Sequence, residues 1–221
     1  MANKKGTGLL MVWVDVPADK EKEFNRWYND EHLAERLAIP GFLAGARYEA
    51  VKGSPKHLAY YELESPAVLE SAAYKKVIAN PTEWTKRFGP QAIGTTYIRN
   101  VYTMIHPKSL TPAITGSPMA PALQIGRMDV PREVDDEWNT WYSTIYVPNY
   151  EKVPGVIRGR RYRAVTGTPQ YLTLYEFEHP KVSESAAWNT QRDAVPVSTR
   201  MRSHMTHAQG SPGVYVKTFE R

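Results

Sequence analysis

Along this chain, short apolar runs typical of strands alternate with segments whose apolar residues recur at helical spacing. Together they predict strands and helices in a regular order. Residues 9–14 are an apolar run that ends before Pro17, and because proline cannot donate a ladder hydrogen bond, we expect a strand that closes there. In the charged segment that follows, four apolar residues recur at helical spacing: Phe24, Trp27, Tyr28 and Leu33. The chain is therefore expected to open with a strand and a helix that packs an aromatic stripe against a sheet.

Two further strands, a second helix and a closing strand complete the first half of the chain. Residues 46–51 and 58–63 have the composition of strands, and the Gly-Ser-Pro-Lys turn between them predicts a hairpin. Residues 65–74 predict a helix with serine at its N-cap and proline at its first position. With a last strand at 97–105, the order is β-α-β-β-α-β, which is typical of ferredoxin-like units.

The same pattern then occurs a second time. Residues 15–74 recur at 129–188 with a constant offset of 114 and no gap, and about 26 of these 60 positions are identical. We therefore expect an α+β chain of two tandem ferredoxin-like repeats, at 1–105 and 122–221, joined by a linker at 106–121 that is rich in proline, serine and threonine. Because a four-stranded sheet with helices on one side has a bare second face, the two antiparallel sheets are expected to pack as an α/β barrel.

Positions that differ between the two copies are the better candidates for chemistry, since positions kept in both are expected to be scaffold. Glu31 and His32 stand opposite Ile145 and Tyr146. Pro148 interrupts the second helix, so both helices are expected to end near this point, with His32 and Tyr146 in a last turn or in the loop after it.

Composition narrows the function classes. The 28 basic and 23 acidic side chains give a net charge of +5, but they are scattered singly, so no nucleic-acid or membrane partner is expected. No apolar run reaches membrane-spanning length, the N-terminus lacks a secretory signal, and the absence of cysteine fits a reducing cytoplasm. Phosphate loops and dinucleotide motifs are absent, and His204 and His207 lack an acidic cluster, so we expect neither a cofactor nor a metal.

At this point the motif Trp-Tyr-Asn-Asp-Glu-His-Leu at 27–33, with the segments 39–42, 47–48 and 60–64, resembles a known family. It is similar to the dimeric α/β-barrel superfamily and, within it, to the EthD-like proteins. That resemblance implies the barrel fold more strongly than any one reaction, because the superfamily includes polyketide cyclases, cofactor-free monooxygenases, muconolactone isomerase and haem enzymes. It also implies that His32 ends the first helix and points its imidazole into the barrel.

His32 is the first candidate for catalysis, because an imidazole with a pKa near 6.5 suits proton transfer at neutral pH. As a general acid or base it needs an orienting carboxylate, and Glu31, Glu35 and Glu62 are all candidates. The alternative is a helix-end histidine that neutralises the helix dipole and donates to a last-turn carbonyl.

Glu62 is the second catalytic candidate. It shares one strand face with Leu58 and Tyr60, and a carboxylate on an apolar face is costly unless it is paired or used. Arg47 on the adjoining strand is its expected cross-strand partner. If that pair fails, Glu62 becomes a further acid or base.

The numerous aromatic residues predict a cavity with apolar walls and hydroxyl donors, although each one alone can also be read as core. Such a cavity suits an aromatic or phenolic ligand better than a sugar or a nucleotide. The residues expected to bind substrate are Trp13, Tyr28, Tyr48, Tyr61, Arg127 and Tyr146. Arg127 stands opposite Trp13 in the repeat, and Arg160 opposite Ala46, which could direct one end of the cavity toward an anionic group.

These features predict a cofactor-independent enzyme that acts on a small aromatic or polyketide-like molecule, with His32 moving a proton in a lyase, cyclase or isomerase step. Two alternatives stay open. One is a non-catalytic ligand-binding or accessory protein of EthD type, and the other is a haem-dependent or cofactor-free oxygenase. Since the two repeats can pair within one chain, the dimer of single-repeat relatives is expected to be internal here, and a further homodimer through outer surfaces is left open.

Overall fold

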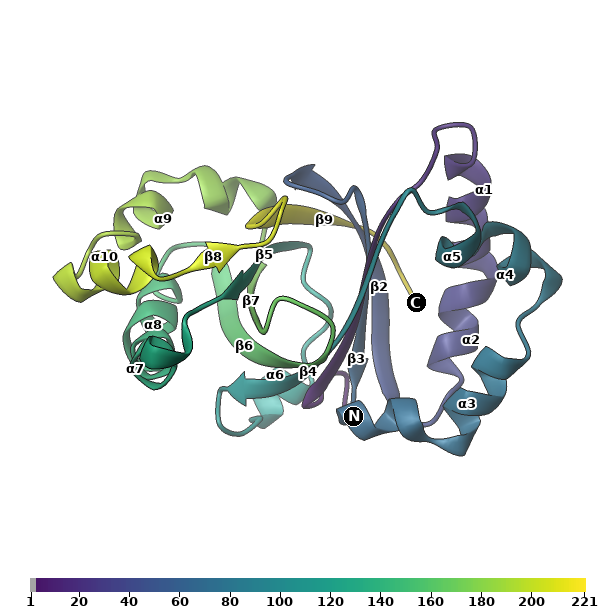
Figure 1. Cartoon of the computed structure of the whole chain (residues 1–221), viewed down its shortest axis with the longest axis horizontal. Coiled ribbons are helices and arrows are strands. Elements are labelled where there is room, and N and C mark those ends of the chain that lie inside the picture. Colours follow the sequence, from purple (N-terminus) through teal and green to yellow (C-terminus); the bar gives the residue numbers. More distant parts are fainter. Residues whose placement is uncertain (1–2) are drawn as a thin grey trace.

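The computed structural model describes residues 3–221, and its centre is a closed antiparallel barrel. Nine strands form one sheet in the order β7-β6-β4-β1-β3-β2-β9-β5-β8, and a β7–β5 pairing closes the ring. The two-residue strand β8 (Thr206–His207) pairs only with the edge of β5, so the other eight strands form the barrel (Figure 1). Their bounds are β1 Gly8–Asp15, β2 Phe42–Lys52, β3 His57–Leu63, β4 Thr96–His106, β5 Ala122–Asp129, β6 Val156–Thr166, β7 Tyr171–Phe177 and β9 Gly213–Glu220.

Each half of the chain contributes four neighbouring strands to this ring. The first half supplies β4-β1-β3-β2 and the second supplies β9-β5-β7-β6. Two antiparallel ladders join the halves, β4 with β6 and β2 with β9. The expected meeting of two antiparallel sheets in one α/β barrel is therefore confirmed, and the ladders make the two halves one continuous sheet.

The helices lie outside the barrel in two groups, one on each side, and only the short α6 lies between them, at the bottom of Figure 1. From β1 to α3, the elements of the first half start 114 residues before those of the second: β1 starts at Gly8 and β5 at Ala122, and α3 at Ala72 and α9 at Ala186. In the first half the helices are α1 Glu21–Trp27, η1 Tyr28–His32, α2 Leu33–Leu37, η2 Pro66–Glu70, α3 Ala72–Ala79, α4 Glu83–Phe88 and α5 Pro90–Ile93. The later ones are α6 Pro112–Thr115, η3 Arg132–Val134, α7 Asp135–Trp141, η4 Tyr142–Tyr146, α8 Val147–Tyr150, η5 Pro180–Glu184, α9 Ala186–Gln191 and α10 Pro196–Ser203.

The expectation that the first helix ends near His32 is wrong. The helix passes through a π-helical turn, η1, and continues as α2, because the amide of Leu33 donates to the carbonyl of Tyr28 five residues earlier. The second half repeats this turn in η4, and Pro148 does not end the helix. It lies in the first turn of α8, where a missing amide hydrogen costs little.

The second helix of each half also begins later than expected. Residues 66–70 form only a 3-10 turn, and Ser65 makes no side-chain cap. The α-helix starts at Ala72, and the Ser71 side chain caps it by accepting a hydrogen bond from the amide of Tyr74 at 3.1 Å. Ser185 does the same for α9.

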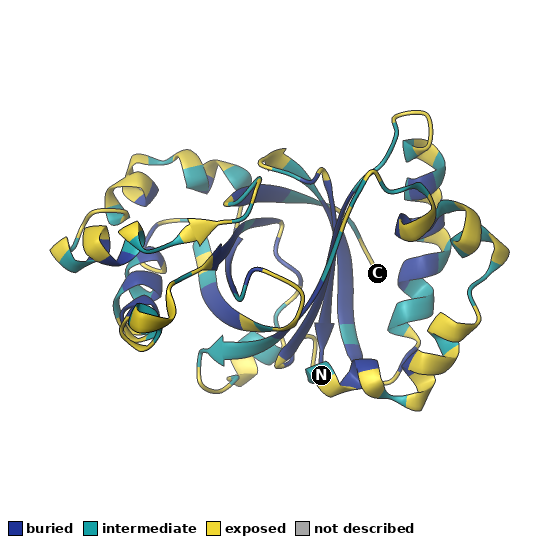
Figure 2. Cartoon of the chain, in the orientation of Figure 1, coloured by how far each residue is buried: buried dark blue, intermediate teal, exposed yellow. Residues whose placement is uncertain are grey.

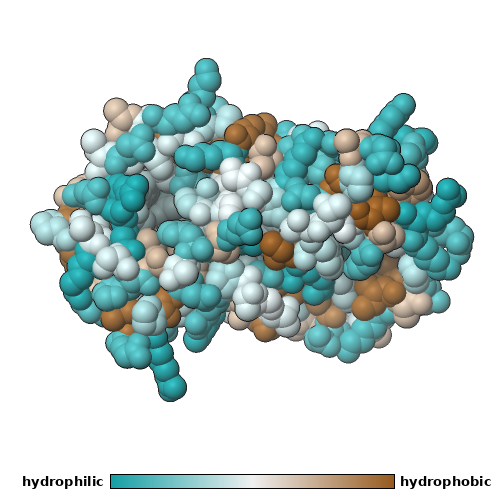
Figure 3. Space-filling view, turned by 45° about the horizontal axis from the view of Figure 1, so that its top comes forward, coloured by the Kyte–Doolittle hydropathy of each residue, from teal (hydrophilic) through white to brown (hydrophobic). Residues whose placement is uncertain are grey.

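Three apolar clusters hold the fold together, one inside the barrel and one under each group of helices. Alternation along β3 separates them: Leu58 and Tyr60 face the interior, whereas Tyr61 and Leu63 face the helices. The strands are buried along most of their length, and the exposed residues lie on the outer sides of the helices (Figure 2). On the surface in Figure 3, apolar side chains form small separate groups among polar ones.

The segment expected to be a linker connects the halves but is not a free spacer. It contains the short helix α6, and Met119 and Ala120 are buried in the barrel-interior cluster. The hydroxyl of Tyr48 donates to the carbonyl of Ala120 at 2.9 Å. The segment therefore packs against the barrel interior, and the repeat boundaries at 105 and 122 stay predictions. In the described part of the chain, no helix combines the length and the apolar composition that a membrane crossing needs.

Candidate functional site

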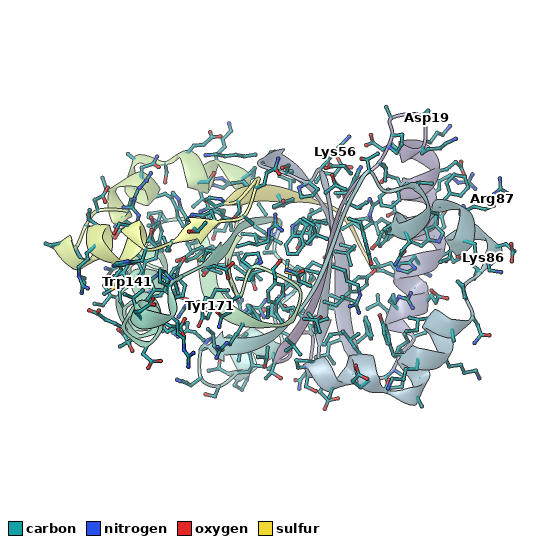
Figure 4. The ribbon with its side chains drawn as sticks, in the orientation of Figure 1. Asp19, Lys56, Lys86, Arg87, Trp141 and Tyr171 are labelled. Carbon is teal, nitrogen blue, oxygen red and sulfur yellow. The ribbon has the colours of Figure 1, made fainter. Side chains whose placement is uncertain are left out.

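A cavity of about 310 Å³ lies between the helices of the first half and the outer face of its sheet. Leu10 and Val12 of β1 and Tyr61 of β3 line it from the sheet, and His32 of η1 lines it from the helix. Helices α3, α4 and α5 contribute further walls, and Lys86 of this group lies at the outer edge of the molecule (Figure 4). The volume is within the ~300–1,000 Å³ range of small-molecule sites.

The expectation that His32 points into the barrel is wrong. Its helix covers the outer face of the sheet, so the side chain can reach only that face, and the barrel interior is lined by alternate strand residues instead. The imidazole is 9% exposed and lies 4.3 Å from the Trp27 ring, with the edge of Tyr28 at 5.0 Å between centroids. His32 is therefore a buried side chain in the wall of the cavity, in the middle of a helix.

The surroundings of His32 keep its imidazole neutral. Burial lowers the pKa of His32 well below its usual value, and the nearby Arg36 charge lowers it further. Its Nδ1 has no hydrogen-bond partner among the described residues, and the closest carboxylate oxygen, Oε2 of Glu35, is 3.6 Å away. Burial also raises the pKa of Glu35. A neutral imidazole beside a carboxyl group can accept a proton and share the resulting charge.

Of the three carboxylates considered as partners of His32, only Glu35 lies beside it. Glu31 accepts hydrogen bonds from the hydroxyls of Thr82, at 2.6 Å, and Thr85, at 3.3 Å, which hold it to the start of α4. Glu62 faces the barrel interior on the other side of the sheet. Glu35 is thus the residue that the geometry selects for orienting the imidazole.

Tyrosines supply the hydroxyl groups of the cavity. Tyr28 and Tyr61, both expected as substrate-binding residues, line it beside His32. Burial raises the pKa of Tyr28 to about 12, so its hydroxyl stays protonated and can donate. The Tyr61 hydroxyl interacts weakly with that of Tyr28 and makes no hydrogen bond of ordinary length among the described residues. Tyr74 and Arg99 also line the cavity, joined by a 3.0 Å hydrogen bond from the guanidinium to the phenol oxygen. The sequence reasoning missed both, although Tyr74 directly follows the repeated Ser-Ala-Ala segment.

The expected Arg47–Glu62 pair is wrong, because these two residues lie on opposite faces of the sheet. Arg47 is paired with Ala59 in the β2–β3 register and faces the helices, where its guanidinium lies 4.8 Å from the Tyr28 ring and donates to Asn29. Glu62 is paired with Ala44 and faces the interior. Because side chains alternate between the two faces of a sheet, the β2–β3 register places the two charges on opposite faces.

Inside the barrel, Glu62 is bound instead by a cation from the other half of the chain. Arg160 donates to both carboxylate oxygens of Glu62, at 2.5 and 3.3 Å, and to Glu176 at 2.8 Å. The ammonium of Lys5 lies 3.7 Å from Glu62 and 3.5 Å from Glu176. All four side chains are at most 1% exposed, so this cluster binds the two halves together rather than meeting a ligand.

The remaining residues expected to bind substrate lie away from His32. Trp13 and Tyr48 belong to the barrel interior, and the Arg127 guanidinium lies 4.7 Å from the Trp13 ring and donates to the carbonyl of Gln209. Tyr146 lies under the helices of the second half. The structure therefore brings together only His32, Tyr28 and Tyr61 from the expected set.

Comparison with known proteins gives a fold but no sequence relative. No family model and no curated protein sequence matches the chain. Among solved structures, an anthrone oxidase-like protein superposes with a TM-score of 0.67 at 16% identity, over 98% of this chain and 93% of the other. This chain has the dimeric α/β-barrel fold. A candidate monooxygenase from Fusobacterium nucleatum superposes with a TM-score of 0.61 at 10% identity, over 98% of this chain and 94% of the other. A chlorite dismutase variant from Candidatus Nitrospira defluvii superposes with a TM-score of 0.59 at 10% identity, over 98% of this chain and 92% of the other.

Haem, one of the alternatives that the sequence left open, does not fit the position of His32. The cavity of about 310 Å³ is enclosed by side chains of the sheet and of α3, α4 and α5. The imidazole is also packed between Trp27 and Tyr28, with Nδ1 on the side of Glu35. No step is therefore derived through haem.

Proposed function

We propose that this chain is a cofactor-independent enzyme that moves a proton on a small aromatic or polyketide-like molecule bound beside His32. One observation carries the proposal. A neutral, buried imidazole with an unpartnered Nδ1 lines an aromatic cavity and has a carboxyl group, that of Glu35, 3.6 Å away. Buried polar atoms without partners are uncommon in folded proteins, and in a cavity they mark a place where a ligand or its proton can bind.

The cavity suits a flat ligand with an acidic C–H or O–H group. Leu10, Val12 and Trp27 offer apolar contacts, and the hydroxyls of Tyr28 and Tyr61 can donate to an oxygen that becomes a phenolate or an enolate. His32 would take the proton, and the carboxylate of Glu35 would stabilise the imidazolium that forms. A lyase, cyclase or isomerase step can follow from the same anion.

A second candidate, cofactor-free oxygenation, begins with the same proton transfer. It is favoured by the fold neighbours described as anthrone oxidase-like and as a monooxygenase. His32 would remove a proton from an activated CH2 group, and the carbanion would pass one electron to O2. The radical pair would form a C–O bond, and the peroxide would take up the proton. Loss of water, with departure of the second C–H proton, would leave a ketone, so that O2 supplies one oxygen to the product and one to water.

The finer assignments belong to the same proposal. We infer an EthD-like barrel made of two tandem ferredoxin-like repeats, supported by the offset of 114 residues that corresponding elements keep from β1 to α3. Only the first repeat would use a histidine for proton transfer, because the second repeat has Tyr146 at the position of His32. Glu62 is left out of the mechanism, since its carboxylate is enclosed in the barrel and bound by Arg160.

Anthrone is a suitable probe, because its CH2 group is acidic and its oxidation product absorbs visibly. Deuterium uptake at that carbon under anaerobic conditions reports proton transfer, and O2 consumption in air reports oxygenation. His32→Ala is expected to lower both rates by roughly 100-fold or more, in line with the ~10²–10⁴-fold contribution of general acid–base catalysis. Tyr146→Phe in the other half is the matched control and should leave both rates unchanged. A His32→Ala variant that exchanges deuterium like the wild type would refute the assignment.

A non-catalytic binding role makes a different prediction with the same proteins. A binding protein would hold the aromatic ligand without accelerating exchange, and His32→Gln, which keeps a polar group of similar reach, would bind equally well. Measuring ligand affinity and exchange on one preparation therefore separates the two functions.

A further inference from the structure

A second cavity, of about 390 Å³, lies between the outer face of the second half's sheet and its helices. It is lined by the side chains of Tyr142, Tyr146, Tyr150, Thr173, Tyr175 and Trp188. It shares no lining residue with the cavity beside His32. A cavity of this kind thus lies under each group of helices, and the second has no role in the proposed reaction.

The residues that define the proposed chemistry are replaced in the second cavity. At the constant offset of 114, Tyr146 takes the place of His32, Asn149 that of Glu35, and Tyr150 that of Arg36. The hydroxyls of Tyr146 and Tyr150 lie 3.3 Å apart, within hydrogen-bond distance of each other. The imidazole and its carboxylate have therefore become a pair of neutral phenols, which can donate hydrogen bonds but do not supply a base at neutral pH.

The charges around the second cavity all have one sign. Lys52, Arg192 and Arg202 line it, and none of the described residues that line it is an aspartate or a glutamate. Arg202 is paired with Asp193 at 2.5 Å, but Lys52 and Arg192 form no ion pair with any residue from 3 to 221. Cations at the mouth of a cavity without a carboxylate attract an anion.

Two buried hydroxyls inside the cavity lack a well-formed hydrogen bond. The Tyr175 hydroxyl and Thr173 Oγ1, both on β7, make no hydrogen bond of ordinary length among the described residues and interact only weakly with the Tyr142 hydroxyl. These residues are 4% and 1% exposed. Because a buried donor without a well-formed hydrogen bond destabilises the folded state, both hydroxyls are available to donate to an acceptor on a ligand. The aromatic rings of Trp188 and Tyr150, 4.2 Å apart between centroids, provide flat contact surface next to them.

We propose that this second cavity is a binding site for a small aromatic carboxylate. The ring system of the ligand would lie among Trp188 and the tyrosines, and its oxygens would accept from the Tyr175 and Thr173 hydroxyls. Its negative charge would face Lys52 and Arg192 at the mouth. The buried imidazole and the carboxyl group of the first cavity have no counterpart here. His207 of β8 also lines the cavity, but it is exposed and forms no ion pair with a described carboxylate, so the site holds its ligand without converting it.

The test uses the full-length protein and two probes of similar shape. 1-Hydroxy-2-naphthoate carries the carboxylate, and 1-naphthol lacks it; both are titrated by calorimetry. Tyr175→Phe removes one of the two buried hydroxyls without changing the packing, and Arg192→Gln removes one free cation. Arg200→Gln removes an exposed arginine of the same region that does not line the cavity, and His32→Ala removes the imidazole of the first cavity.

The naphthoate is expected to bind at least 10-fold more tightly than the naphthol. Tyr175→Phe and Arg192→Gln should each weaken naphthoate binding by roughly 5- to 20-fold, because hydrogen bonds and contacts to a charged group are worth about 1–2 kcal/mol. Arg200→Gln and His32→Ala should leave it within 2-fold. Equal affinity for the two probes would overturn the proposal, and so would loss of binding in His32→Ala with none in Tyr175→Phe. The anthrone exchange assay is separate, so either proposal can fail alone.

Discussion

Removing Arg160 tests the charged cluster that joins the two halves of the barrel. Its guanidinium donates to Glu62 and Glu176, the carboxylates of two strands from different halves, and all three side chains are at most 1% exposed. In Arg160→Met the chain keeps a side chain of similar length but loses the cation. Two buried carboxylates then depend on Lys5, at 3.5 and 3.7 Å, and on Arg158 beside Glu176.

The expected loss of stability is large. Breaking a buried ion pair on one side costs about 3–5 kcal/mol, because it leaves a desolvated charge without compensation. For a domain of this size, each kcal/mol lowers the melting temperature by roughly 2–4 °C, so Arg160→Met should melt about 6–20 °C below the wild type. Replacing both charges together should cost less, since a well-packed neutral pair avoids desolvating either charge.

Urea denaturation of four proteins measures this: the wild type, Arg160→Met, Glu62→Gln and the double variant. The double variant should be more stable than the sum of the single losses implies, by at least 1 kcal/mol, as expected for residues in direct contact. Glu137→Gln, which breaks an exposed pair with Arg200, is the control and should change the free energy of unfolding by less than about 0.5 kcal/mol. If Arg160→Met lost less than 1 kcal/mol, the cluster would not be what holds the halves together.

Two further predictions concern acid stability and helix capping. Burial alone would raise the pKa of Glu176, but the charges of Arg160, Lys5 and Arg158 outweigh it and hold the pKa below 4.5. A depressed carboxyl pKa stabilises the folded state above the unfolded pKa, so the free energy of unfolding should fall as the pH drops below about 4.5, and a flat urea series between pH 5 and pH 3 would contradict this. Ser71→Ala should cost about 0.5–2 kcal/mol by thermal denaturation, because the side chain caps α3, whereas Ser65→Ala, which removes no cap, should not exceed about 0.5 kcal/mol.

Much of the fold could be read from local patterns. The strands at 9–14, 46–51, 58–63 and 97–105 all exist, each extended at one or both ends, because apolar alternation and turn residues are local properties. The ends of the helices were harder to predict from the sequence. A π-turn at Tyr28–His32 adds one residue to a turn without any change of composition, so periodicity alone did not reveal that the helix continues to Leu37.

The sequence contained a signal for Arg160 as the partner of Glu62, although it was not used in the prediction. Strand alternation places Ala46 on the same face as Tyr60, and Arg160 occupies the position of Ala46 in the second copy. An arginine on an interior face predicts a buried carboxylate opposite it. What alternation could not supply was the distance between the two copies, which the closing ladders β4–β6 and β2–β9 set.

By itself, the sequence determined the order of strands and helices, the offset of 114 residues and the replacement of His32 by Tyr146, because each follows from neighbouring side chains or from comparison along the chain. Only the tertiary structure decided which face of the sheet each candidate meets. His32 faces an outer cavity with Tyr28 and Tyr61, whereas Glu62 lies inside the barrel with Arg160. The physical reason is that a helix covers only one side of a sheet, whereas successive residues of a strand point to opposite sides. Candidates from the same half of the chain therefore reach separate sites.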